Sequence, residues 1–61
     1  MGNEIIKELR LKNNMYQREL GELVGKSKAS ISRYEKNVVT PHKNTALKIA
    51  EVFGIDLDLL D

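Results

Sequence analysis

The residues of this sequence best placed to do chemistry together are basic ones concentrated between positions 26 and 36. This segment has four basic side chains and one acidic one, a local charge of +3: Lys26, Lys28, Arg33 and Lys36 against Glu35. Residues 4–25 have four of each sign, and residues 37–61 have two basic and four acidic side chains, so the whole chain carries only +1. A local positive stripe is what contact with a polyanion requires, although the solvated face of an ordinary helix would carry similar charge.

Residues for catalysis or metal binding are scarce. The chain has no cysteine and one histidine, His42, so it can form neither a disulfide, nor a thiolate zinc site, nor a histidine metal cage. It also has no glycine-rich phosphate loop and no nucleophile paired with a histidine base. We therefore expect neither an enzyme nor a protein that holds a metal or a cofactor.

The sequence does not predict a membrane or secretory segment. It contains no apolar run of about 18 residues, the length at which a membrane span is considered. The opening residues, Met1-Gly2-Asn3-Glu4, lack the basic start and apolar core of a signal peptide. We expect a cytoplasmic protein without a membrane partner.

Apolar side chains recur with a helical period along the chain, which predicts an all-α fold. The first helix is expected to run from an Asn3 cap to about residue 12, and a last turn is expected to follow an Asp56 cap. Between them lie predicted helices at residues 17–24, 28–36 and 43–53. Because 61 residues leave room for one small core, we expect a single domain over residues 1–61.

The second and third predicted helices form an unusual pair, because each is only two or three turns long. Their inward side chains are apolar and recur at helical spacing: Leu20, Leu23, Val24, Ile31 and Tyr34. Gly25 suits the left-handed end of the second helix, and Ser27 suits the cap of the third. A three-residue connection that contains glycine sets two short helices at a steep angle.

Residues 17–36, QRELGELVGKSKASISRYEK, resemble the helix-turn-helix of the Cro and phage-repressor family, also called the XRE family. In this resemblance Gly21 takes the small-residue position where the two helices cross, and Gly25 takes the turn. The flanking segments also look like the family's outer helices, so the resemblance covers nearly the whole chain. It implies a compact five-helix lambda-repressor-like domain in which residues 28–36 form the recognition helix.

One arc of the predicted third helix faces away from its apolar arc. At about 100° per residue, this outward arc holds Lys28, Ala29, Ser32, Arg33 and Lys36. An α-helix fits the major groove of DNA, where arginine can donate two hydrogen bonds to guanine and alanine can contact a thymine methyl group. We therefore predict base contacts by the first four of these residues, led by Arg33.

Phosphate contacts are predicted around the rim of the same surface. The N-terminal amides of the second helix can bind a phosphate, and the resemblance implies a backbone contact for Gln17. The full predicted set is Gln17, Lys26, Ser27, Ser30, Lys36, Asn37 and Lys43. The competing interpretation for each of them is an ordinary solvated surface residue.

Two further expectations concern how the helices are held. The resemblance implies a structural ion pair between Arg10 and Glu35, and removing one partner should cost more than the pair contributes, because the other charge is left unmatched. Tyr16 departs from the family pattern, since a Ser or Thr usually caps the second helix. We therefore expect Glu19 to lack its capping-box partner and that helix start to be less secure.

Together these features predict a sequence-specific regulator of transcription, in particular a repressor that occupies operator DNA, of bacterial or phage origin and associated with the nucleoid. One recognition helix reads few base pairs, so we expect a homodimer, at least on DNA, with half-sites about 34 Å apart. Candidate dimer contacts are Val38, Val39, Leu57 and Leu60, for which core burial is the competing role. The alternative function is a protein-interaction or antitoxin-type module in which the basic stripe is incidental.

Overall fold

The computed structural model describes residues 4–60, which form helices joined by short connections and contain no β-strand. The helices are α1 (Glu4–Lys12), α2 (Gln17–Val24), α3 (Lys28–Glu35) and α4 (Lys43–Phe53), followed by the 3-10 turn η1 (Leu57–Leu60). Every helix predicted from the periodicity is therefore present, and the all-α prediction is confirmed. The third helix ends at Glu35, one residue earlier than predicted, and the predicted Asn3 cap lies outside the described residues.

Left-handed residues end several of these elements. Gly25 (φ 74°) follows α2 and Gly54 (φ 66°) follows α4. Asn14 (φ 56°) and Asn37 (φ 60°) have the same conformation in the connections after α1 and α3. Glycine and asparagine tolerate this region best, so the chain places suitable residues at all four of its positive-φ positions within residues 4–60.

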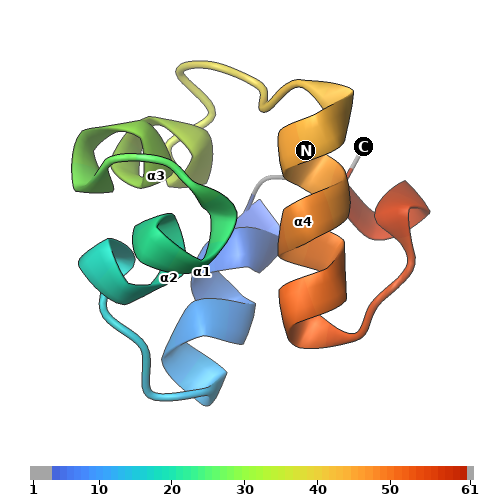
Figure 1. Cartoon of the computed structure of the whole chain (residues 1–61), viewed down its shortest axis with the longest axis horizontal. Helices are drawn as coiled ribbons and strands as arrows, with labels where there is room; N and C mark the ends of the chain where they lie inside the picture. The colour runs from blue at the N-terminus through green and yellow to red at the C-terminus, as the bar shows by residue number, and fades with distance from the viewer. Residues whose placement is uncertain (1–3, 61) are drawn as a thin grey trace.

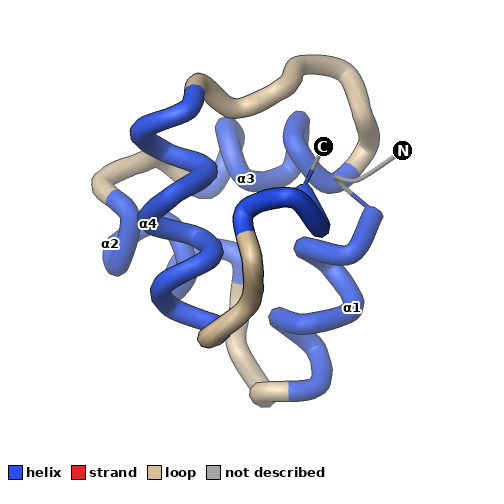
Figure 2. The backbone as a smooth tube through the Cα atoms, turned by 90° about the vertical axis from the view of Figure 1, so that its right-hand side faces the viewer, coloured by secondary structure: helices blue, strands red, loops and turns tan. Residues whose placement is uncertain are grey.

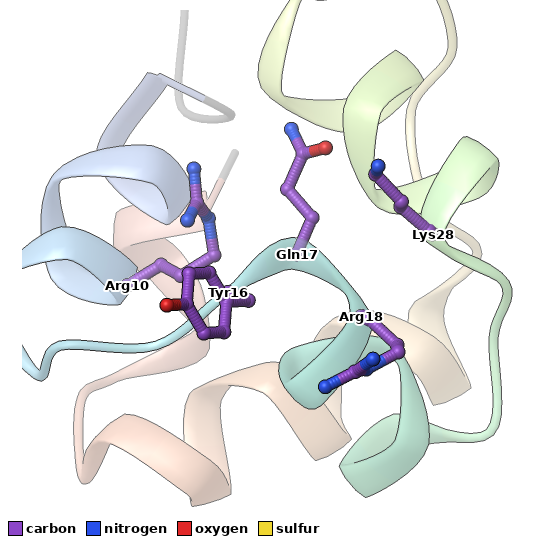
Figure 3. Close-up of a pocket in the computed structure, with 5 residues that line it drawn as sticks. All are labelled: Arg10, Tyr16, Gln17, Arg18 and Lys28. Atoms are coloured by element: carbon purple, nitrogen blue, oxygen red, sulfur yellow. The ribbon is translucent and has the colours of Figure 1, made fainter.

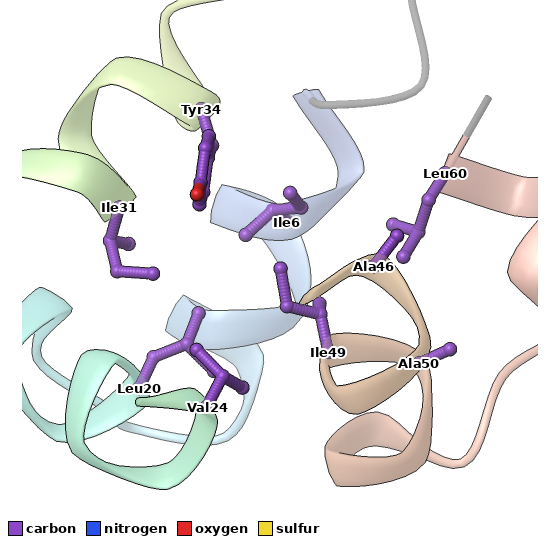
Figure 4. Packing of buried hydrophobic residues seen from close by; sticks show 9 residues of the cluster. All are labelled: Ile6, Leu20, Val24, Ile31, Tyr34, Ala46, Ile49, Ala50 and Leu60. Atoms are coloured by element: carbon purple, nitrogen blue, oxygen red, sulfur yellow. The ribbon is translucent and has the colours of Figure 1, made fainter. Parts of the chain in front are cut away.

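The core draws on all five elements, and Figure 4 shows its side chains converging. Its buried apolar members are Ile6, Leu20, Val24, Ile31, Tyr34, Ala46, Ile49, Ala50 and Leu60. Because Leu60 belongs to this core, with 4% of its surface exposed, η1 is needed to close the fold. Leu60 is therefore corrected from a candidate dimer contact to a core residue.

The arrangement leaves α3 on one side of the molecule. It packs against α2 and α1, while η1 packs against α4 and α1. Figure 1 places α3 and η1 on opposite sides with α4 between them, and in Figure 2, which is viewed from the η1 side, η1 lies in front of α3. The outward surface of α3 is consequently not covered by the C-terminal part of the chain.

Leu23 is one apolar residue that the periodicity placed wrongly. Its side chain is 58% exposed, whereas Leu20 and Val24 are buried. At about 100° per residue, Leu23 lies roughly 100° around the helix from Val24. The buried face of α2 also includes Gly21, which shifts its centre away from Leu23.

Candidate nucleic-acid interface

Helix α3, the predicted recognition helix, buries one face and exposes the other. Ile31 and Tyr34 point into the core, while Lys28, Ala29 and Arg33 are exposed. Ser32 is half-buried, between the two faces. Among residues 4–60, neither Lys28 nor Arg33 has a side-chain hydrogen bond or ion pair, so both can reach an outside partner.

The start of α3 is fixed by its own side chains. Ser27 caps the helix: its hydroxyl oxygen accepts a hydrogen bond from the Ser30 amide at 3.1 Å and donates one to the Ser30 hydroxyl at 3.2 Å. Both serines are predicted phosphate contacts, and both side chains are engaged in the cap. A phosphate accepts hydrogen bonds, and the Ser30 hydroxyl hydrogen is free to donate one, whereas the Ser27 hydroxyl hydrogen would first have to turn away from Ser30.

The turn before α3 depends on two glycines. The Lys26 amide donates a hydrogen bond to the Gly21 carbonyl at 2.8 Å, and Gly25 provides the left-handed conformation that this bond requires. Gly21 lies so close to the turn that a Cβ atom there would be 2.5 Å from the Lys26 carbonyl oxygen. This close approach sets α2 against the start of α3 and leaves the Lys26 side chain exposed.

The start of α2 has half of a capping box. The Glu19 carboxylate accepts a hydrogen bond from the Tyr16 amide at 2.8 Å, so Glu19 makes its own half of the box although position 16 has no Ser or Thr. The Tyr16 side chain makes no cap bond and is 72% exposed. Only one of the two hydrogen bonds of a capping box is therefore present at the start of α2.

A groove of about 470 Å³ runs beside the start of α2 (Figure 3). Its lining residues come from three helices and the α1–α2 connection: Arg10, Tyr16, Gln17, Arg18 and Lys28. Arg18 is exposed and is not among the residues predicted from the sequence, since residues 4–25 carry no net charge and their basic residues were not proposed to contact DNA. Its position directly after Gln17, at a helix N-terminus, is the signal that would have found it.

Arg10 and Glu35 form the ion pair that the resemblance implied. Arg10 Nε donates to Glu35 Oε2 at 2.6 Å and Nη2 donates to Oε1 at 3.1 Å. Their side chains are 8% and 3% exposed. The pair joins α1 to α3 beneath the surface formed by α2 and α3.

The remaining predicted residues lie in the connection between α3 and α4, at the start of α4 and in η1. Lys36, Asn37 and Lys43 are exposed, as are Val38 and Val39. A second groove of about 300 Å³ lies between the start of α4 and η1, lined by Thr40, Pro41, Lys43, Ala46, Leu57, Asp58 and Leu60. Leu57 is half-buried, so of the four candidate dimer contacts three retain some exposed surface.

Residues 4–60 contain neither a cluster of metal-ligating side chains nor a helix that could span a membrane. No group of three or more His, Cys, Asp or Glu side chains in this range could hold a metal ion. No helix in the described part of the chain is long and apolar enough to cross a membrane.

The helix pair and its exposed face define a helix-turn-helix protein. The Helix-turn-helix family model matches residues 6–60, and the chain belongs to that family. In structure it is similar to the P22 c2 repressor protein, solved in complex with synthetic operator 9T in the presence of Tl+. That match has 28% sequence identity and a TM-score of 0.93, and covers 98% of this chain and 91% of the other. The comparison with curated proteins finds no match. The resemblance inferred from residues 17–36 is confirmed.

Proposed function

We propose that this chain is a sequence-specific DNA-binding repressor, which occupies operator DNA by placing α3 in the major groove. The observation that carries the proposal is its similarity, over 98% of its length, to a repressor in complex with an operator. The exposed and unpaired Arg33 and Lys28 support the same function, because a buried or neutralised α3 could not read DNA.

Base contacts are proposed for Lys28, Ala29, Ser32 and Arg33. Arg33 can donate two hydrogen bonds to guanine O6 and N7, a geometry that distinguishes guanine from the other bases. Ala29 is exposed one residue after the start of α3 and suits a thymine methyl group. Ser32 is half-buried, so its proposed contribution is smaller.

Phosphate contacts are proposed for side chains that surround α3: Gln17, Lys26, Ser27, Ser30, Lys36, Asn37 and Lys43. Arg18 is added to this set because it lines the groove at the start of α2 together with Gln17 and Lys28. The amides at that helix start add partial positive charge. Contacts of this kind position the protein on the duplex without reading its sequence.

The DNA-bound form is proposed to be a homodimer, since one recognition helix reads too few base pairs for an operator. Val38, Val39 and Leu57 remain the candidate contacts. The groove beside Leu57 carries both a basic residue, Lys43, and an acidic one, Asp58. In a two-fold interface the same surface of both copies is in contact. Lys43 of one copy could then pair with Asp58 of the other, and Asp58 with Lys43.

Residues 1–61 are proposed to act as one domain that performs no catalysis and needs no cofactor or metal. Since operator DNA is its proposed partner, its place is with the nucleoid in a bacterial cytoplasm.

The test starts from duplexes selected by the protein out of a random library, which also gives the half-site spacing. Fluorescence anisotropy then compares the selected and a random duplex. Arg33→Ala should reduce the preference for the selected duplex about tenfold. Lys43→Ala, the control, should weaken binding to both duplexes equally. It should also reduce the salt slope, the slope of log affinity against log salt concentration, by about one. Undiminished preference in Arg33→Ala would defeat the assignment of α3. Absence of salt-sensitive DNA binding would favour the protein-interaction module.

A further inference from the structure

The Glu35 carboxylate is where three helices meet. It accepts two hydrogen bonds from Arg10 of α1, and Oε1 also accepts one from Gln17 Nε2 of α2 at 2.9 Å. Glu35 itself ends α3 and its side chain is 3% exposed. A carboxylate with three donors in a low-dielectric setting forms strong, geometrically defined bonds.

The same ion pair also holds the residue that precedes the α2 start. Arg10 Nη1 donates to the Met15 carbonyl at 2.7 Å. Met15 and Gln17 lie on either side of Tyr16, so the chain is anchored just before and just after the N-cap residue of α2. The position of the Gln17 side chain relative to α3 is therefore defined by buried groups and does not depend on DNA.

Gln17 retains one donor for an outside acceptor. An amide nitrogen carries two hydrogens, and the bond to Glu35 uses one of them. The side chain is half-buried and lines the groove at the start of α2, where Figure 3 shows its amide between Arg10 and Lys28. A glutamine held in place loses less conformational entropy on binding than a free one.

We propose that Glu35 is a positioning residue for DNA binding: its buried carboxylate holds the Gln17 amide so that the second N–H donates to a DNA phosphate. This proposal rests on the proposed function. It gives the ion pair a role beyond stability, because the contact at the start of α2 then depends on a residue at the end of α3.

A double-mutant cycle tests the coupling. Replacing Arg10 and Glu35 together, as Arg10→Met with Glu35→Leu, removes the carboxylate without stranding a charge, a change that buried ion pairs often tolerate. Gln17→Ala is then made in the parent and in this apolar background, and binding to a fluorescein-labelled duplex selected by the parent protein is measured. We expect Gln17→Ala to weaken binding about tenfold in the parent and at most about twofold in the apolar background. Equal losses in the two backgrounds would overturn the proposal.

Arg18→Ala is the matched control. Arg18 is the next residue of α2 and makes no hydrogen bond or ion pair with Arg10 or Glu35. Its loss should weaken binding by the same factor in both backgrounds. Gln17→Ala should leave the salt slope unchanged, since a neutral amide displaces no counterion, whereas Arg18→Ala should lower that slope by about one. If the Arg18 effect shrinks in the apolar background as much as the Gln17 effect, the whole α2 start has moved, and specific positioning of Gln17 is refuted.

Nuclear magnetic resonance of the parent protein keeps the proposal falsifiable even if the apolar variant unfolds. In the free protein the Gln17 amide proton bonded to Glu35 should be displaced from the shift of an unbonded glutamine amide and should exchange slowly with solvent. Adding the selected duplex should shift mainly the other proton. If both Gln17 protons in the free protein have the shifts of an unbonded glutamine amide and exchange rapidly with solvent, the positioning is refuted even if the protein binds DNA. A parent protein that binds no duplex would instead refute the proposed function.

Discussion

Gly21→Ala is a sensitive test of how α2 meets the turn. A Cβ atom at this position would lie 2.5 Å from the Lys26 carbonyl oxygen and 3.4 Å from the carbonyl carbon. These are backbone atoms, so no side-chain rotation relieves the contact. The turn also cannot retreat freely, because the Lys26 amide donates to the Gly21 carbonyl at 2.8 Å. Either α2 moves away from the start of α3 or this hydrogen bond is lost.

The expected magnitude combines two opposing effects. In the interior of an ordinary helix, alanine is more favourable than glycine by about 1 kcal/mol. Overpacking a tight interior site costs about 1–3 kcal/mol, and a clash with backbone belongs at the upper end. We therefore expect Gly21→Ala to lower the free energy of unfolding by about 1–2 kcal/mol, which in a domain of this size lowers Tm by roughly 5–15 °C.

Urea and thermal unfolding followed by far-ultraviolet circular dichroism would measure the change. Glu22→Ala, at the exposed neighbouring position of α2, is the control for helix propensity and should be within about 0.5 kcal/mol of the parent. DNA affinity of the folded Gly21→Ala protein should also fall, because α3 is displaced relative to Gln17. A Gly21→Ala protein as stable as the parent, or more stable, would refute the close approach as the reason for glycine.

Two further predictions concern stability and use the same unfolding measurements. Ser27→Ala should cost about 1 kcal/mol through loss of the α3 cap, whereas Ser32→Ala should change little; equal effects would contradict the capping role. Leu60→Ala should cost about 2–5 kcal/mol of stability as a core truncation. Leu59→Ala, at a residue that is 51% exposed, should change stability little. A Leu60→Ala protein as stable as the parent would contradict the core role and favour the dimer contact.

The helices and most of the core were predictable because local chemistry and periodicity agree. Ile31 and Tyr34 recur on one face, Ser27 precedes that helix as a cap, and Gly25 ends the one before. Each signal is contained within a few residues, so no knowledge of tertiary contacts is needed. The outward position of Arg33 follows from the same spacing.

Contacts between elements were less predictable, for a physical reason in each case. A single turn such as η1 is too short for its period to define a face, so Leu60 in the core could not be told from Leu60 at an interface. The bond from Gln17 to Glu35 joins residues 18 apart in sequence and depends on the angle at which α2 crosses α3. The groove shared by Arg18 and Lys28 depends on that same angle.

The charge distribution adds an argument about how the domain would meet DNA. A net charge of +1 gives little overall attraction, so binding to random DNA should be weak at physiological salt. The basic segment 26–36 includes α3, whereas the exposed acidic residues Asp56 and Asp58 lie before and within η1, on the opposite side of the molecule (Figures 1 and 2). The field of a duplex would attract the first side and repel the second, turning α3 toward the groove during approach. The charge distribution therefore orients α3 toward the duplex without greatly increasing the affinity for random DNA. Discrimination between sequences is then left to the base contacts of α3.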